Sequence, residues 1–145
     1  LSVFSTRLLN NNDLEIYEDG NQSRDFIYID DVVDATTLAL EKNDKLSYVL
    51  NVGYGKPISV LSVAKQLMKN YEKNQKINIT GKYRLGDIRH NYSDLTQVKK
   101  ILGFYPKFTF AQGLLNFTNW VRQQKVENDM YVISENELKN KGLLK

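Results

Sequence analysis

The sequence predicts a single α/β domain that includes parallel strands. Along the chain, segments in which apolar and polar residues alternate, as in strands, are followed by segments with the helical spacing of apolar residues. This order of strands and helices is typical of α/β folds. Residues 48–52 are almost continuously apolar, as in a strand that is buried on both faces of a parallel sheet. The length of 145 residues, with 41% apolar and 26% charged residues, is that of one globular domain with a core.

Local patterns define the elements in order. Residues 1–10 have helical spacing, and residues 14–17 and 24–29 alternate as strands on either side of turn residues 18–21. The other expected elements are helices at 31–42, 59–71, 94–103 and 109–124, strands at 48–52 and 77–80, and a weak helix at 135–141. The expected helix caps are Asp30 or Asp31, Ser59, Asp94, and Thr109 in a capping box with Gln112, and Gly103 ends the helix that begins at Asp94.

The composition excludes several kinds of chemistry. There is no cysteine and only one histidine, His90, so disulfides, thiolate metal sites and His-rich zinc sites are excluded. No apolar stretch approaches the roughly 20 residues of a membrane span, and no signal-peptide pattern is present, so we expect a cytoplasmic protein that does not contact a membrane. The net charge of +3 comes from scattered lysines, which does not indicate a nucleic-acid partner.

No catalytic motif is visible in the sequence. Gly53-Tyr54-Gly55 follows a predicted strand, but it lacks the third glycine of a dinucleotide-binding turn and is followed by Pro57. No serine lies in a nucleophile elbow that His90 could serve.

Three places favour ligand binding over catalysis. Tyr17 ends a strand beside a turn, where its ring could stack on a base or simply pack against the fold. Arg24 could bind phosphate or pair with its neighbours. The loop 83–90 contains Arg84, whose guanidinium fork suits phosphate, and Asp87, which suits a diol, so the loop is either a nucleotide site or a solvated loop.

Four segments, in this order, carry a family resemblance: 14–20 (LEIYEDG), 24–32 (RDFIYIDDV), 51–53 (NVG) and 84–87 (RLGD). Over residues 1–124 the chain resembles the C-terminal part of the NAD-dependent nucleotide-sugar epimerases and dehydratases, which are extended short-chain dehydrogenases/reductases. The resemblance implies the last parallel strands of a Rossmann-like fold plus a small substrate-binding subdomain. It divides the chain into a nucleotide-sugar-binding half at 1–124 and a polar tail at 125–145.

The resemblance also implies roles for six residues toward a UDP- or dTDP-sugar. Tyr17 would stack on the pyrimidine, Arg24 and Arg84 would bind the diphosphate, and Asp87 would bind the ribose. Asn51 would lie near the phosphates, and Asn91 would face the hexose. The implied reaction is oxidation at C4 of the sugar by NAD, followed by epimerisation or dehydration; the base and the sugar stay open.

The chain departs from this family in two respects. It has neither the glycine-rich NAD turn nor a Tyr-x-x-x-Lys pair, since Gln75 follows Tyr71 and Thr109 follows Tyr105 at that spacing. We therefore expect NAD to be bound by an N-terminal half outside this chain, and the chain alone to be inactive. The strand at 48–52 would then lack its neighbours, so we expect self-association.

Two other functions stay open. The chain could be a stand-alone nucleic-acid-binding module that uses Tyr17, Tyr28 and scattered lysines, or a protein interaction module whose arginines serve only surface pairing. The first predicts steep salt dependence of oligonucleotide binding, and the second predicts no effect of UDP or dTDP on thermal stability.

Overall fold

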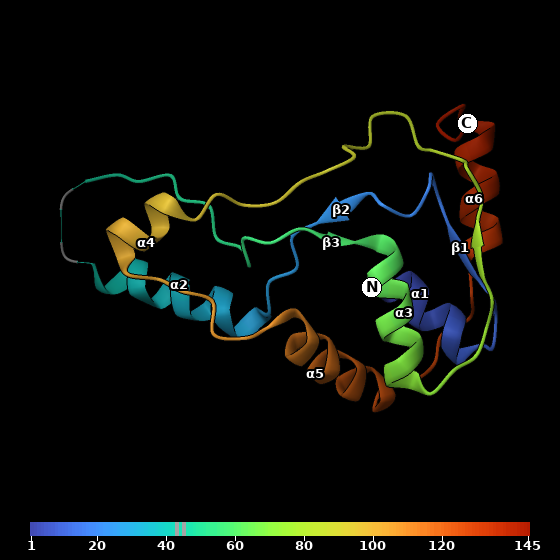
Figure 1. Cartoon of the computed structure of the whole chain (residues 1–145), viewed down its shortest axis with the longest axis horizontal. Helices are drawn as coiled ribbons and strands as arrows, with labels where there is room; N and C mark the ends of the chain where they lie inside the picture. Colours follow the sequence, from blue (N-terminus) through green and yellow to red (C-terminus); the bar gives the residue numbers. More distant parts are fainter. Residues whose placement is uncertain (43, 45) are drawn as a thin grey trace.

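The computed structural model describes residues 1–42, 44 and 46–145, which contain six helices and four short strands. In chain order these are α1 (Ser2–Leu9), β1 (Leu14–Ile16), β2 (Ser23–Arg24), α2 (Ile29–Glu41), β3 (Ile58–Ser59), α3 (Val60–Tyr71), β4 (Ile77–Ile79), α4 (Thr96–Leu102), α5 (Phe110–Arg122) and α6 (Tyr131–Asn140). Figure 1 shows α2 and α4 together at one end of the molecule and α1, α3 and β1 at the other. No helix among the described residues is long and apolar enough to cross a membrane.

The larger core lies between β1 and the helices α1, α3 and α5. β1 and β4 pair in parallel, with Leu14 opposite Ile77. Leu14 and Ile16 both point into this core because alternate residues of a strand lie on one face. Leu8 of α1 and Leu67 of α3 are fully buried against them. This packing fixes the position of the residues that leave the C-terminal end of β1.

A smaller core lies between α2 and α4. Ala35, Val98 and Phe104 are buried there, and Leu50 and Val52 pack against them. The two cores lie toward opposite ends of the molecule (Figure 1).

The predicted strand at 48–52 does not form. Leu50 and Val52 pack against the smaller core, whereas Val49 is 99% exposed. A strand exists only through pairing with a neighbour, and no strand pairs with this segment in the described part of the chain. The two strands that do pair in parallel are β1 and β4.

The predicted strand at 24–29 is also much shorter than expected. β2 contains only Ser23 and Arg24, and it pairs antiparallel with β3. The next residues turn toward α5, because Phe26 packs on the ring of Phe110 and Tyr28 on that of Phe108.

The helix starts at Ser59 and Thr109 are confirmed. Ser59 Oγ accepts a hydrogen bond from the Ser62 N–H at 3.2 Å. Thr109 and Gln112 form the complete capping box, in which each side chain accepts from the backbone of the other. Both helices therefore begin where short-range sequence signals place them.

The helix predicted to begin at Asp94 starts slightly later. Asp94 Oδ1 accepts from the N–H of Thr96 at 2.9 Å, but α4 itself begins at Thr96. Gly103 ends α4 in the left-handed conformation, with φ of 64°, as predicted.

The prediction that Asp30 or Asp31 caps α2 is wrong. Tyr28 is the N-cap residue, and both aspartates lie in the first turn. Asp31 is fully buried, and its carboxylate accepts hydrogen bonds from the backbone N–H groups of Lys107 (2.8 Å) and Phe108 (3.2 Å). Asp31 thus joins α2 to the chain that leads into α5.

Replacement of Asp31 by alanine should lower the free energy of unfolding by about 2–4 kcal/mol, because two partly buried N–H groups lose a charged acceptor. Asp30→Ala is the matched control. It removes a neighbouring, exposed charge from the same helix turn and should cost below about 1 kcal/mol. Urea denaturation of both variants measures the difference, and equal costs would contradict the role given to Asp31.

Candidate functional site

A cleft of about 360 Å³ brings together four of the six predicted site residues. Tyr17, Arg24, Arg84 and Asp87 all line it, although they come from three separate segments of the chain. Its other walls come from α1, β1 and α6. Two arginines, an aromatic ring and a carboxylate in one concave site form a suitable set for a nucleotide.

Tyr17 is held where β1 ends. Its carbonyl oxygen accepts a hydrogen bond from Gln22 Nε2 at 3.0 Å, and the Gln22 side chain is buried beneath the turn. Gly20 takes φ of 79° in this turn, and a Cβ there would lie 3.2 Å from Leu61. The turn is therefore packed tightly, and the half-buried Tyr17 ring projects into the cleft.

Arg24 leaves β2 and also enters the cleft. Its Nη1 donates to the carbonyl oxygens of Ser23 (2.8 Å) and Arg89 (3.1 Å), which fixes the guanidinium without neutralising it. Among the described residues, no carboxylate lies within salt-bridge distance of Arg24. The guanidinium keeps a full positive charge for an anionic ligand.

Arg84 and Asp87 are paired with each other. Arg84 Nε and Nη2 donate to Asp87 Oδ2 at 2.9 and 2.6 Å. The two side chains are 48% and 38% exposed, and an ion pair of such exposure contributes about 0–1 kcal/mol. A ligand that offered phosphate to Arg84 and hydroxyl groups to Asp87 could replace this pair at little cost.

The carboxylates in the cleft already have partners. Glu15 accepts from Asn78, Glu18 from Arg89, Asp87 from Arg84, and Glu135 from Lys82 and Lys139. The hydrogen bonds from Lys139 and then Lys82 hold the pKa of Glu135 below its usual value. Because of these partners, the carboxylates that line the cleft repel an anionic ligand less than the same number of unpaired carboxylates would.

Arg89, in contrast, is not available to a ligand. Its guanidinium pairs with both Glu18 and Asp19. The backbone N–H of Asn21, and next the Arg89 side chain, lower the pKa of Asp19 to about 2. These contacts fix the loop 83–90 to the turn that carries Tyr17.

Asn51 and Asn91 lie outside the cleft lining. Asn51 is exposed in the segment that failed to form a strand, and the side chain of Asn91 is exposed as well. The backbone N–H of Asn91 donates to the Ser23 carbonyl at 3.2 Å, which keeps it near Arg24. Their roles toward a sugar or phosphate stay predictions.

The Gly53–Gly55 turn does not form a phosphate-binding loop. Its N–H groups at Tyr54 and Gly55 donate to the Asp25 carboxylate at 2.7 and 3.0 Å. A Cβ on Gly53 would lie 2.3 Å from Ser93 Oγ and 2.5 Å from Asp25 Oδ2. The turn is filled by protein, so glycine is needed here for close packing.

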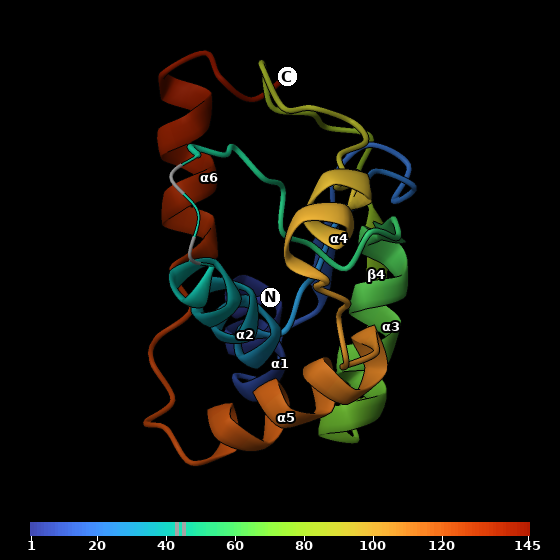
Figure 2. The same cartoon turned by 90° about the vertical axis from the view of Figure 1, so that its left-hand side faces the viewer.

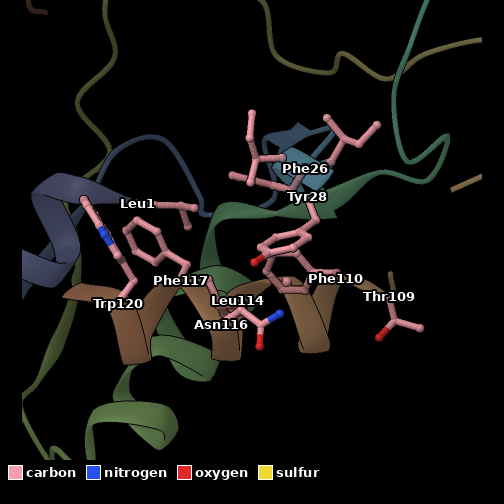
Figure 3. Close-up of a pocket in the computed structure, with 12 residues that line it drawn as sticks. Leu1, Phe26, Tyr28, Thr109, Phe110, Leu114, Asn116, Phe117 and Trp120 are labelled. Carbon is pink, nitrogen blue, oxygen red and sulfur yellow. The ribbon is translucent and has the colours of Figure 1, made fainter. Parts of the chain in front are cut away.

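A second cleft, of about 420 Å³, is mainly apolar and lies against α5 (Figure 3). Phe26, Tyr28, Phe110, Phe117 and Trp120 contribute rings to it. None of the charged residues that line the first cleft lines this second one. No pattern in the sequence had predicted a site here.

The sequence reasoning missed Gln22 and the residues of α6. Tyr131, Ser134, Glu135 and Leu138 line the first cleft at helical spacing, so one face of α6 forms a wall of it. α6 begins at Tyr131, a full turn before the weak helix predicted at 135–141, because Asp129 Oδ1 accepts the Tyr131 N–H at 2.9 Å. In the sequence, the helical spacing of these four residues could have indicated that they lie on one face of a helix.

The family model for the NAD-dependent epimerase/dehydratase family matches residues 1–53. A dTDP-L-rhamnose 4-epimerase of Burkholderia thailandensis is 30% identical over 86% of this chain and 34% of its own length. The solved structure of the UDP-glucose 4-epimerase of Thermotoga maritima with UDP-glucose is 33% identical, with a TM-score of 0.76, over 84% of this chain and 38% of that one. This chain belongs to the NAD-dependent epimerase/dehydratase family. A UDP-glucuronic acid 4-epimerase from Bacillus cereus, solved with UDP-glucuronic acid and NAD, is 27% identical with a TM-score of 0.76, over 83% of this chain and 38% of that one.

This chain spans 34 to 38% of the length of these three relatives. Its fold is of the α/β class of these Rossmann-like relatives, with the parallel pair β1–β4. The family depends on NAD, but the described residues do not fit a dinucleotide: the one glycine-rich turn after an extended apolar segment has its N–H groups bound to Asp25.

An NMR pH titration should give Asp19 a pKa of about 2. Because this value lies below the ordinary 3.8, the contacts of Asp19 favour the folded state at neutral pH and are lost as the pH falls toward 2. Arg89→Gln should raise the pKa only in part, since the Asn21 N–H stays bound. An Asp19 pKa at its ordinary value in the unaltered chain would contradict this geometry.

Proposed function

We propose that the cleft binds the nucleoside diphosphate of a UDP- or dTDP-sugar, as part of an NAD-dependent 4-epimerase or dehydratase. The observation that carries this proposal is that Tyr17, Arg24, Arg84 and Asp87 line one cleft. Relatives with the same fold support it, since the Thermotoga maritima enzyme was solved with UDP-glucose.

Each residue has a defined task in this proposal. The Tyr17 ring stacks on the pyrimidine, which contributes about 1–3 kcal/mol. Arg24 and Arg84 bind the two phosphates, where the planar fork of each guanidinium suits phosphate oxygens. Asp87 accepts hydrogen bonds from the ribose hydroxyls.

The two asparagines complete the proposed substrate contacts. Asn51 would lie near the phosphates and Asn91 near the hexose, and both are exposed, so a ligand could reach them. Neither asparagine identifies the base or the sugar.

This chain contributes binding energy far from the reacting carbon. Contacts with the base and diphosphate hold the sugar in place for a redox step that other parts of the whole protein perform. The sequence has no Tyr-x-x-x-Lys pair to move a proton at C4. We therefore expect the 145-residue chain to bind the nucleotide and to show no turnover.

Calorimetry with UDP, dTDP and a single-stranded oligonucleotide tests the proposal. UDP or dTDP should bind, and Arg24→Ala or Arg84→Ala should weaken binding at least about tenfold, because each removes a charge-assisted contact to phosphate. Arg122→Ala is the matched control, since Arg122 lies on α5 and donates to the Asn70 carbonyl outside the cleft. It should bind as the unaltered chain does.

Two results would contradict the proposal. Absence of any binding of UDP and dTDP would favour a protein interaction module. Oligonucleotide binding that weakens steeply with salt, without a preference for UDP or dTDP, would favour a nucleic-acid-binding module.

We also expect the 145-residue chain to self-associate. Leu46 and Val49 are exposed, and Trp120, at the rim of the apolar cleft, is 58% exposed. Apolar surface of this kind favours association in water. Light scattering at increasing concentration should show a rising mass; a constant monomer mass at high concentration would contradict this expectation.

A further inference from the structure

The C-terminal tail, residues 125–145, returns to the candidate cleft after α5. Figure 2 shows α6 along one side of the molecule, after which the chain turns back toward the segment that contains residues 81–90. Tyr131, Ser134, Glu135 and Leu138 of α6 line the cleft together with Tyr17. The tail therefore forms one wall of the cleft and does not extend away into solvent.

The tail is attached at both of its ends. At its start, Asp129 Oδ2 accepts hydrogen bonds from Arg7 Nη1 (3.2 Å) and Asn12 Nδ2 (2.8 Å). At its end, Tyr83 and Lys145 exchange two backbone hydrogen bonds of 2.9 Å. The second attachment lies one residue before Arg84, so the tail contacts the loop that carries the proposed phosphate ligand.

The centre of the tail contacts the proposed base-binding residue directly. The Tyr131 hydroxyl donates to the Tyr17 hydroxyl at 3.3 Å, and Glu135 Oε1 lies 3.4 Å from the same Tyr131 hydroxyl. The guanidinium of Arg7 lies 4.3 Å from the centroid of the Tyr131 ring. Burial, and next the contact with Tyr17, raise the pKa of Tyr131, so its hydroxyl keeps the proton that it donates.

Glu135 holds the middle of α6 against the cleft. It accepts from Lys82 at 2.6 Å and from Lys139 at 2.8 Å, and its side chain is only 12% exposed. Lys82 neighbours the Tyr83 attachment. The contacts of α6 are thus concentrated on the face that lines the cleft, while Glu137 on another face is exposed and pairs with Lys141.

We propose that α6 is part of the nucleotide site, with Tyr131 as the positioning residue that holds the Tyr17 ring against a pyrimidine base. This inference rests on the proposed function. In it, Tyr131 fixes the hydroxyl end of the Tyr17 ring, and Leu138 and Ser134 limit the width of the cleft beside that ring. A wall of this kind favours a pyrimidine nucleotide over the larger purine nucleotide.

The test compares binding of UDP and ADP to the 145-residue chain by calorimetry. Tyr131→Ala should bind UDP at least about tenfold more weakly and should lose part of the preference for UDP over ADP. Tyr131→Phe keeps the ring and loses only the hydroxyl bond, so it should weaken UDP binding about threefold to tenfold. Glu137→Ala is the matched control on the exposed face of α6 and should bind UDP normally.

A second measurement separates this role from a general loss of folding. If α6 favours nucleotide binding, UDP must in turn stabilise α6, so the amides of residues 131–140 should exchange more slowly with UDP bound. Thermal unfolding of Tyr131→Phe should match that of the unaltered chain closely, because its packing is retained.

The outcomes are distinct. UDP binding by the unaltered chain, together with equal or tighter binding by Tyr131→Ala, would overturn the role of α6 and leave the proposed function standing. Unchanged amide exchange in α6 on UDP binding would overturn it too. Absence of UDP binding by the unaltered chain would overturn the proposed function and this inference with it.

Discussion

The carboxylate of Asp25 joins the backbone beside Arg24 to two distant segments of the chain. It accepts backbone hydrogen bonds from Tyr54, Gly55 and Ser93, at 2.7, 3.0 and 3.0 Å. These donors lie 29, 30 and 68 residues away in the sequence. An ionised acceptor is suited to such a junction, because it satisfies several N–H groups at once with strong hydrogen bonds. Arg24, the residue beside it, is held in place as a consequence.

The charges around the cleft follow one pattern, in which almost every acid has a basic or amide partner. Arg89 pairs with Glu18 and Asp19, and Lys82 pairs with Glu135. The cation that lines the cleft without an acidic partner among the described residues is Arg24. Since the exposed Arg84–Asp87 pair is weak, an anionic ligand meets one free arginine and a second that is easily released.

Short-range signals in the sequence predicted much of the fold. The capping box at Thr109, the cap at Ser59 and the end of α4 at Gly103 each depend on residues within a few positions, and all three are confirmed. Long-range contacts were not predictable in the same way. The buried carboxylate of Asp31 resembled an ordinary cap because the sequence cannot show its bonds to Lys107 and Phe108, more than 70 residues away.

The same distinction applies to the strand at 48–52 and to the site. An apolar run shows that a segment prefers burial, but it becomes a strand only if a neighbour pairs with it, and Val49 here is exposed. The family motifs predicted Tyr17, Arg24, Arg84 and Asp87 as site residues, and these four residues line one cleft. They gave no indication of α6, because its contacts belong to a tail outside those motifs.

The backbone pairing of Tyr83 with Lys145 has a practical consequence for work with this protein. A purification tag fused after Lys145 would emerge beside the loop that carries Arg84, where it could block access to the cleft. Affinity measurements are therefore best made with the C-terminus free of added residues.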